Sequence, residues 1–158
     1  MTLTSSRFWR GAMYGVIGTI AMSVVMTLLH VTNVLPATIY ISAITRMFAI
    51  ALGERGELPA AALALAVPFY LAYGAIWAGL AAITTPQMTW WKGAVLGVGL
   101  WIIQMMFVVP FSAENSWAPV YSAKIWVGTL LMHLAYGITT GALMEKHEPL
   151  EAHATSLG

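Results

Sequence analysis

The chain has 158 residues, of which 59% are apolar and only 8% are charged, whereas about a quarter of the residues in a soluble domain are charged. A net charge of +1 without charge runs excludes electrostatic binding of nucleic acid. The absence of cysteine excludes disulfides, thiolate metal sites, iron–sulfur clusters and cysteine nucleophiles. This composition predicts an all-α membrane protein that lies in a lipid bilayer.

Four apolar runs are long enough to cross a bilayer, because a membrane helix needs about 20 mainly apolar residues. In chain order they cover residues 8–33, 60–84, 90–109 and 124–144. They leave only short connections, so we predict a single domain over residues 1–158, folded as a four-helix transmembrane bundle.

Prolines mark where two of these runs stop, since proline resists continuing a helix. Pro36 follows the first run and Pro110 follows the third. Residues 38–52 are apolar but too short to span, which predicts a short amphipathic helix in the membrane interface. Residues 145–158 are polar and are predicted to form a C-terminal tail.

Tryptophans mark both predicted water boundaries, as is typical of rings that lie among headgroups. Trp9 and Trp90 lie on one side, and Trp117 and Trp126 on the other. Four crossings place both termini on one side, which carries slightly more basic residues than the other. The positive-inside rule then predicts that both termini lie in the cytoplasm. The basic residues of that side are Arg7, Arg10, Lys92 and Lys146.

Two short sequences recur along the chain. Residues Trp9-Arg10-Gly11-Ala12 resemble Trp91-Lys92-Gly93-Ala94, and the Leu-Ala-Tyr-Gly of residues 71–74 returns at residues 134–137. These matches favour two similar hairpins of the same orientation, related by an axis along the membrane normal. The alternative is chance, because glycine, alanine and aromatic residues are common in membrane helices.

Small residues recur every four positions in the predicted spans and so lie on one face of each helix. Membrane helices associate where small residues let their backbones approach closely, so these faces are predicted to be the helix contacts. The predicted packing residues are Gly11, Gly15, Ser23, Gly74, Ala78, Gly93, Gly97, Gly137 and Gly141.

A known group of proteins has a similar order of features. These are the segment Gly18–Met26, the Leu35-Pro36 break, two Tyr-Gly helices and a glycine-rich third span ending at Pro110. The chain resembles uncharacterised small prokaryotic membrane proteins, among them YagU-like proteins, over roughly residues 11–144. The resemblance implies a fold and no activity. It also implies a second histidine where this chain has Tyr70.

Catalytic and transport chemistry find little support in the sequence. The chain has no aspartate, and its glutamates lie in loops or at helix ends, so a Ser-His-Asp arrangement is excluded. Proton-coupled transport normally needs intramembrane carboxylates or arginines. We therefore expect no enzyme activity, and an oligomeric channel or carrier stays an alternative.

Histidine and methionine provide the main chemical alternative. His133 and His30 are the predicted ligands of a haem or another cofactor. Met22, Met26 and His30 share a helix face and could bind copper, since thioether and imidazole suit Cu(I). The structural interpretation is that methionine fills gaps in the core and that His133, neutral and pointing into the bundle, makes a hydrogen bond. We predict no cofactor and keep haem and copper as alternatives.

The leading hypothesis is therefore a non-enzymatic accessory or structural membrane subunit. It would associate with itself or with a larger membrane complex through the small-residue faces. The two alternatives are a redox or metal-handling protein and an oligomeric channel or carrier.

Overall fold

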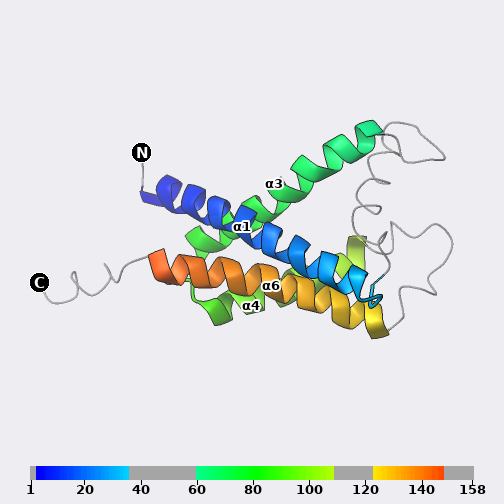
Figure 1. Cartoon of the computed structure of the whole chain (residues 1–158). Coiled ribbons are helices and arrows are strands. Elements are labelled where there is room, and N and C mark those ends of the chain that lie inside the picture. Colours follow the sequence, from blue (N-terminus) through cyan, green and yellow to red (C-terminus); the bar gives the residue numbers. More distant parts are fainter. Residues whose placement is uncertain (1–2, 36–59, 109–122, 148–158) are drawn as a thin grey trace, which may run out of the picture.

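The computed structural model describes residues 3–35, 60–108 and 123–147, and nearly all of them are helical. The elements in chain order are α1 (Leu3–Val31), α3 (Ala60–Thr84), α4 (Trp90–Ile103), the π-helix η1 (Gln104–Val108) and α6 (Ala123–His147). No strand occurs in these three ranges. The predicted all-α, four-helix bundle is confirmed, and Figure 1 shows its arrangement.

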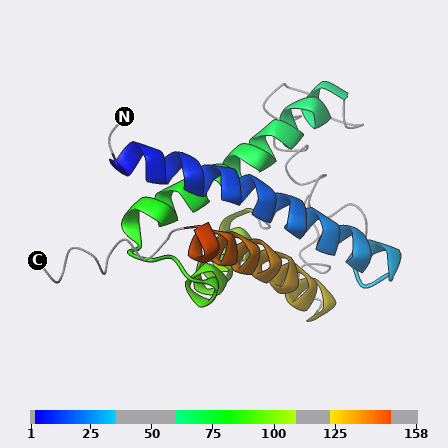
Figure 2. The same ribbon diagram turned by 60° about the vertical axis from the view of Figure 1, so that its left-hand side comes forward.

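The helices form two antiparallel pairs joined through their inner members. α1 packs against both α3 and α6, and α4 packs against α6. The spatial order is therefore α3, α1, α6, α4, with α1 and α6 in the centre. Figures 1 and 2 both show α3 crossing α1 at an angle, so that the first turns of α3 point away from the other helices.

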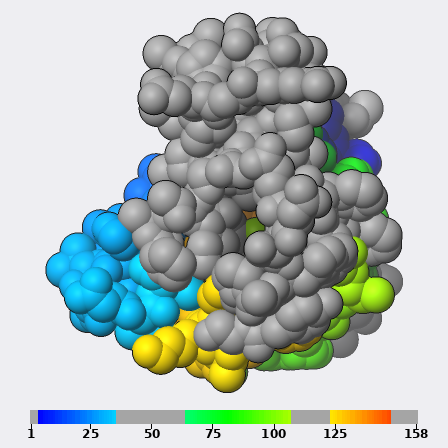
Figure 3. Space-filling view, turned by 90° about the vertical axis from the view of Figure 1, so that its right-hand side faces the viewer, coloured from blue at the N-terminus to red at the C-terminus, as the bar shows by residue number. Residues whose placement is uncertain are grey.

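The beginning of α1 and the end of α6 lie at the same end of the bundle. The rings of Tyr14 and His147 stack there with their centroids 5.6 Å apart. At the opposite end, the last residues of α1 meet the start of α6, where a Cβ on Gly128 would lie 2.8 Å from Leu35. Figure 3 looks onto that end, with α1 in cyan beside α6 in yellow.

The end of α1 has a local cause in the sequence. Asn33 adopts a φ of 56°, in the left-handed region that asparagine tolerates better than most residues. The amides of Val34 and Leu35 then both donate to the Leu29 carbonyl, at 2.9 and 3.0 Å. These bonds cap the Leu29 carbonyl at the end of the helix, and the chain turns before Pro36.

The observed boundaries refine the predicted spans. α1 begins at Leu3, before the predicted start, and α3 covers the predicted residues 60–84. α6 continues to His147, so the first residues assigned to the polar tail are helical, which corrects that boundary. The predicted interfacial helix at residues 38–52 lies outside the described residues, as does the rest of the tail.

Three of the described helices, α1, α3 and α6, are long and apolar enough to cross a membrane. α4 has 14 residues and continues directly into the five-residue η1. The third predicted span is thus helical as far as Val108, but its hydrogen-bond pattern widens at Gln104. The sequence contained no signal for this change.

Candidate functional site

The predicted small-residue faces meet in two places, the first between α1 and α3. A Cβ on Gly11 would lie 2.6 Å from that of Ala82 and 2.8 Å from the Ala78 carbonyl. A Cβ on Gly15 would collide with the Gly74 carbonyl. Glycine is required at both positions because the neighbouring backbone occupies the space of a side chain.

The second contact of this kind lies between α4 and α6. A Cβ on Gly93 or on Gly137 would collide with the backbone carbonyl of the other residue, and Gly141 lies beside Gly93. A Cβ on Gly97 would collide with the carbonyl of His133. All five residues are buried. The structure therefore brings together predicted packing residues in two separate helix pairs.

The two contacts differ in register by one helical turn. Gly15 faces Gly74, but Gly97, which holds the place of Gly15 in the repeated sequence, faces His133 rather than Gly137. His133 is four residues before Gly137, which is about one turn of helix. The repeated tetrapeptides therefore do not occupy equivalent places. The internal repeat of two similar hairpins stays a prediction.

The predicted face of α1 is only partly used as a helix contact. Thr19 is buried, Ser23 is half-buried and Thr27 is exposed. The hydroxyl of Ser23 donates to the Thr19 carbonyl at 2.9 Å, and the hydroxyl of Thr27 donates to the Ser23 carbonyl at the same distance. Ser23 thus satisfies its hydroxyl on its own helix.

A third junction, which the sequence did not reveal, joins α1, α3 and α6. The hydroxyl of Tyr136 in α6 donates to the Gly74 carbonyl in α3 at 2.6 Å. A Cβ on Gly18 in α1 would collide with the Thr140 hydroxyl and lie 2.9 Å from the Tyr136 carbonyl. Tyr136 belongs to the repeated tetrapeptide, but nothing in its spacing indicated a bond to α3.

His133 lies in the contact between α4 and α6, where it is 3% exposed. Its Nδ1 lies 2.8 Å from the Thr129 carbonyl of the same helix. A carbonyl only accepts, so Nδ1 carries the hydrogen and Nε2 is the acceptor of the neutral ring. This hydrogen bond therefore lies within α6. The same tautomer also orients imidazole ligands in metal sites.

A polar group from α4 meets α6 one turn from His133. The indole nitrogen of Trp101 donates to the Thr129 hydroxyl at 2.9 Å, and that hydroxyl donates to the Trp126 carbonyl at 3.1 Å. Trp101 and Trp126 also contact each other edge to face. Sequence reasoning had assigned Trp126 to the water boundary and overlooked Trp101.

The candidate copper ligands lie in different environments. Met22 is buried in the hydrophobic core and Met26 packs against it. His30 is exposed, with its Nδ1 3.4 Å from the Leu35 carbonyl near the end of α1. Within the described ranges, no group of three or more His, Asp or Glu residues could hold a metal ion. Both methionines thus have a packing role.

Comparison with protein families identifies the family of this chain. A family of unknown function, DUF6789, matches residues 5–155. The chain belongs to this family. No curated protein and no solved structure matches the chain.

The match confirms the expected membership of an uncharacterised group, whereas the likeness to YagU-like proteins stays a prediction. The matched DUF6789 region contains both glycine contacts, the three-helix junction, His30 and His133. Since the family has no assigned activity, arguments about function depend on the geometry of this chain.

Proposed function

We propose that this member of DUF6789 is a multi-pass protein of a prokaryotic plasma or inner membrane. In this proposal it is a non-enzymatic accessory or structural subunit that packs against itself or a larger membrane complex. Two features support the proposal: the distribution of charge along the helices and an unfilled glycine position on α4.

Charged side chains in the described helices are confined to helix ends. α6 has no charged residue between Lys124 and Glu145, a stretch of about 20 residues that covers roughly 30 Å, the thickness of a hydrocarbon core. α3 carries no Asp, Glu, Lys or Arg at all. Many large apolar side chains are exposed along the helices, including Val24, Ile76 and Val127. A lipid surround accounts for this pattern.

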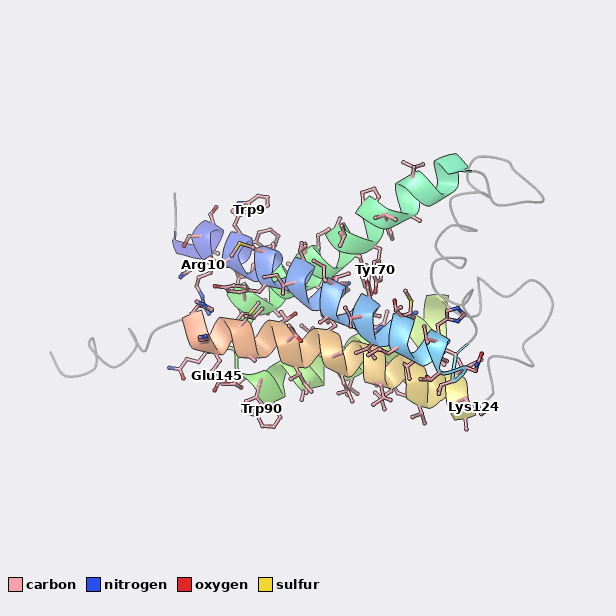
Figure 4. The ribbon with its side chains drawn as sticks, viewed as in Figure 1. Trp9, Arg10, Tyr70, Trp90, Lys124 and Glu145 are labelled. Atoms are coloured by element: carbon pink, nitrogen blue, oxygen red, sulfur yellow. The ribbon has the colours of Figure 1, made fainter. Side chains whose placement is uncertain are left out.

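Basic residues gather at the end of the bundle where α1 begins. In Figure 4, Arg10 and Glu145 lie at that end together with Trp9 and Trp90, and Lys124 lies at the other. The positive-inside rule places this end in the cytoplasm. The two exposed tryptophans fit the level of the lipid headgroups.

The open space beside Gly99 is the observation that supports association with a partner. Ten of the eleven described glycines would bring a Cβ against a neighbouring atom of this chain, but a Cβ on Gly99 would meet no atom of the described residues within 4 Å. Gly99 sits on α4, an outer helix of the bundle, near exposed Ile102, which does not line the groove between α3 and α4. A small residue on a membrane helix face permits close approach by another helix. This face of α4 is therefore the proposed docking surface.

The experiment compares leucine at two glycines of the same helix. We expect Gly99→Leu to block association, because its side chain fills the docking surface, while the thermal unfolding temperature stays near that of the wild type. Gly97→Leu should instead lower the unfolding temperature, since its Cβ collides with the backbone of His133. Mass photometry and co-purification in mild detergent measure association. An unchanged assembly in the Gly99→Leu protein would contradict the proposal.

The proposal also assigns the chain no cofactor and no catalytic activity. Met22 and Met26 contribute to the packing of the core, and His133 is buried with its Nδ1 hydrogen-bonded to the Thr129 carbonyl of its own helix. Metal analysis and the visible absorption spectrum of the purified protein test this part. Bound haem or stoichiometric copper would favour the redox or metal-handling alternative instead.

A further inference from the structure

An open groove of about 620 Å³ lies between the second half of α3 and the start of α4. It forms because these helices, although consecutive, pack against different neighbours: α3 against α1, and α4 against α6. The turn that joins them contributes Thr85 and Met88 to the lining. Figure 2 shows this turn at the end of the bundle where α1 begins. The groove therefore opens on the outer surface between two helices.

The lining of the groove changes from polar to apolar along its length. The outer end of the groove is the end beside the turn between α3 and α4, where Thr84, Thr85 and Lys92 lie. Trp77 and Leu96 line the part farther from this turn. Trp77 is seven residues before Thr84, which is roughly 10 Å along the helix. A ligand that fits this gradient has a polar head at the end of the bundle and an apolar chain running inward.

Lys92 places a fixed positive charge at the outer end of the groove. Its ammonium group donates to the carbonyls of Pro86 and Gln87, both at 2.8 Å, and lies 5.7 Å from the centre of the Trp91 ring. Carbonyl groups orient an ammonium group but do not neutralise it, and its third N–H can serve a ligand.

Within residues 3–35, 60–108 and 123–147, basic side chains outnumber acidic ones around Lys92. Glu145, the one acidic residue in the described part of the chain, accepts a hydrogen bond from the Trp90 amide at 3.0 Å. Arg7 donates to the Thr85 carbonyl on the same turn at 3.5 Å, and Arg10 and Lys146 are exposed at this end of the bundle. The charge around the groove therefore favours an anionic ligand.

We propose that this groove binds one anionic phospholipid, with an acyl chain between α3 and α4 and the phosphate on Lys92. The inference rests on the membrane placement in the proposed function. Basic sites between membrane helices on the cytoplasmic side attract anionic headgroups, and each basic residue near the surface adds to the affinity. The turn holds Lys92 in place before the lipid arrives, which lowers the entropic cost of binding.

The test uses the purified full chain in mild detergent, titrated with lipid and followed by native mass spectrometry. Dioleoyl phosphatidylglycerol and dioleoyl phosphatidylcholine have the same acyl chains and differ in charge. We expect the anionic lipid to bind more tightly. Lys92→Gln should weaken its binding about fivefold, because glutamine can still donate to the turn but lacks the charge. Lys146→Gln is the matched control at an exposed site outside the groove.

A second pair of variants tests the acyl-chain position. Val95 lines the groove and is 62% exposed, so Val95→Trp should fill the groove and abolish lipid binding without unfolding the protein. Val127→Trp is the control, on an exposed position of α6 that does not line the groove. Glycerol phosphate, which lacks the acyl chains, should compete weakly.

Equal binding of the two lipids, or equal effects of Lys92→Gln and Lys146→Gln, would overturn the proposed site. Glycerol phosphate competing as well as the whole lipid would also overturn it, since the acyl chain would then contribute nothing. The Gly99→Leu protein tests the proposed association separately. That variant should lose its partner and still bind phosphatidylglycerol, so failure of one proposal is distinguishable from failure of the other.

Discussion

Hydroxyl side chains in this bundle mostly satisfy themselves on their own helices. Thr19, Ser23, Thr27 and Thr84 each donate to the carbonyl four residues earlier, at 2.8–2.9 Å. Such bonds let polar residues lie in an apolar environment without a partner from another helix. Tyr136 is different, because its hydroxyl reaches the Gly74 carbonyl of α3. A polar residue in these helices therefore does not by itself indicate a contact or a site.

The bond from His133 to the Thr129 carbonyl follows the same local rule, which predicts a small effect of losing that bond. The Thr129 carbonyl also accepts the helical hydrogen bond from the backbone amide four residues later. Loss of the imidazole therefore does not leave that carbonyl without a donor. We expect His133→Leu to lower the free energy of unfolding by about 0.6 kcal/mol, the average for polar contacts inside membrane proteins. His133→Asn should retain more of the stability by keeping a donor. Thermal unfolding of both variants measures the difference.

The same two variants distinguish the structural role of His133 from a ligand role. An amide is a poor substitute for a metal-binding imidazole. If His133 bound haem or copper, both variants would lose the cofactor together, and visible absorption or metal analysis would detect the loss. Equal loss of a bound chromophore in both would contradict the structural role.

At the scale of the helices, packing depends on glycines whose side-chain space is taken by another backbone. Gly15 meets Gly74 between α1 and α3, and Gly93 meets Gly137 between α4 and α6. Lipid tails are as apolar as leucine, so close van der Waals contact rather than hydrophobic burial holds such helices together. Adding a side chain at these glycines should therefore separate the helices.

Leucine at two positions of α3 tests this expectation. A Cβ on Gly74 would collide with the Thr19 hydroxyl and lie 3.3 Å from the Tyr136 ring, whereas Ala72, two residues earlier, is exposed. We expect Gly74→Leu to destabilise the protein by roughly 1–3 kcal/mol or more, as overpacking does. Ala72→Leu should stay within about 0.5 kcal/mol of the wild type, as is usual at surface positions. Thermal unfolding in detergent provides the measurement, and equal stability of the two variants would refute the contact.

At the scale of the whole molecule, the helix order brings the first and last described helices together. α1 and α6 share the centre, while α3 and α4 lie outside them. Two identical hairpins related by a simple rotation would place α3 against α4 as closely as α1 against α6. The structure instead leaves the groove between α3 and α4, so its two halves are not equivalent.

The absence of cysteine makes the proposed orientation easy to test with single-cysteine variants. Ser6 lies at the end of the bundle with the start of α1, and Lys124 lies at the opposite end. In intact cells, a membrane-impermeant maleimide should label Lys124→Cys and spare Ser6→Cys, because the positive-inside rule places Ser6 in the cytoplasm. Labelling of both after the membrane is opened is the control. The reverse pattern would show that the termini face outward.

Much of the fold could be predicted because the relevant signals are local. Apolar runs predicted α3 at its observed limits and placed α1 and α6 within a few residues, since hydropathy and proline act over one helix at a time. Small residues at every fourth position identified the contact faces of Gly11, Gly15, Gly93 and Gly97. The sequence by itself thus determined where the described helices form and which of their faces allow close approach.

Only the tertiary structure decided which face meets which, and at what height. A slip of one turn preserves an i+4 pattern, so the sequence could not distinguish Gly97 against Gly137 from Gly97 against His133. The contact of Gly18 with Tyr136, the unfilled position at Gly99 and the groove beside Lys92 depend on the placement of whole helices. That placement follows from the summed close contacts among several similar small-residue faces, which no single helix sequence contains.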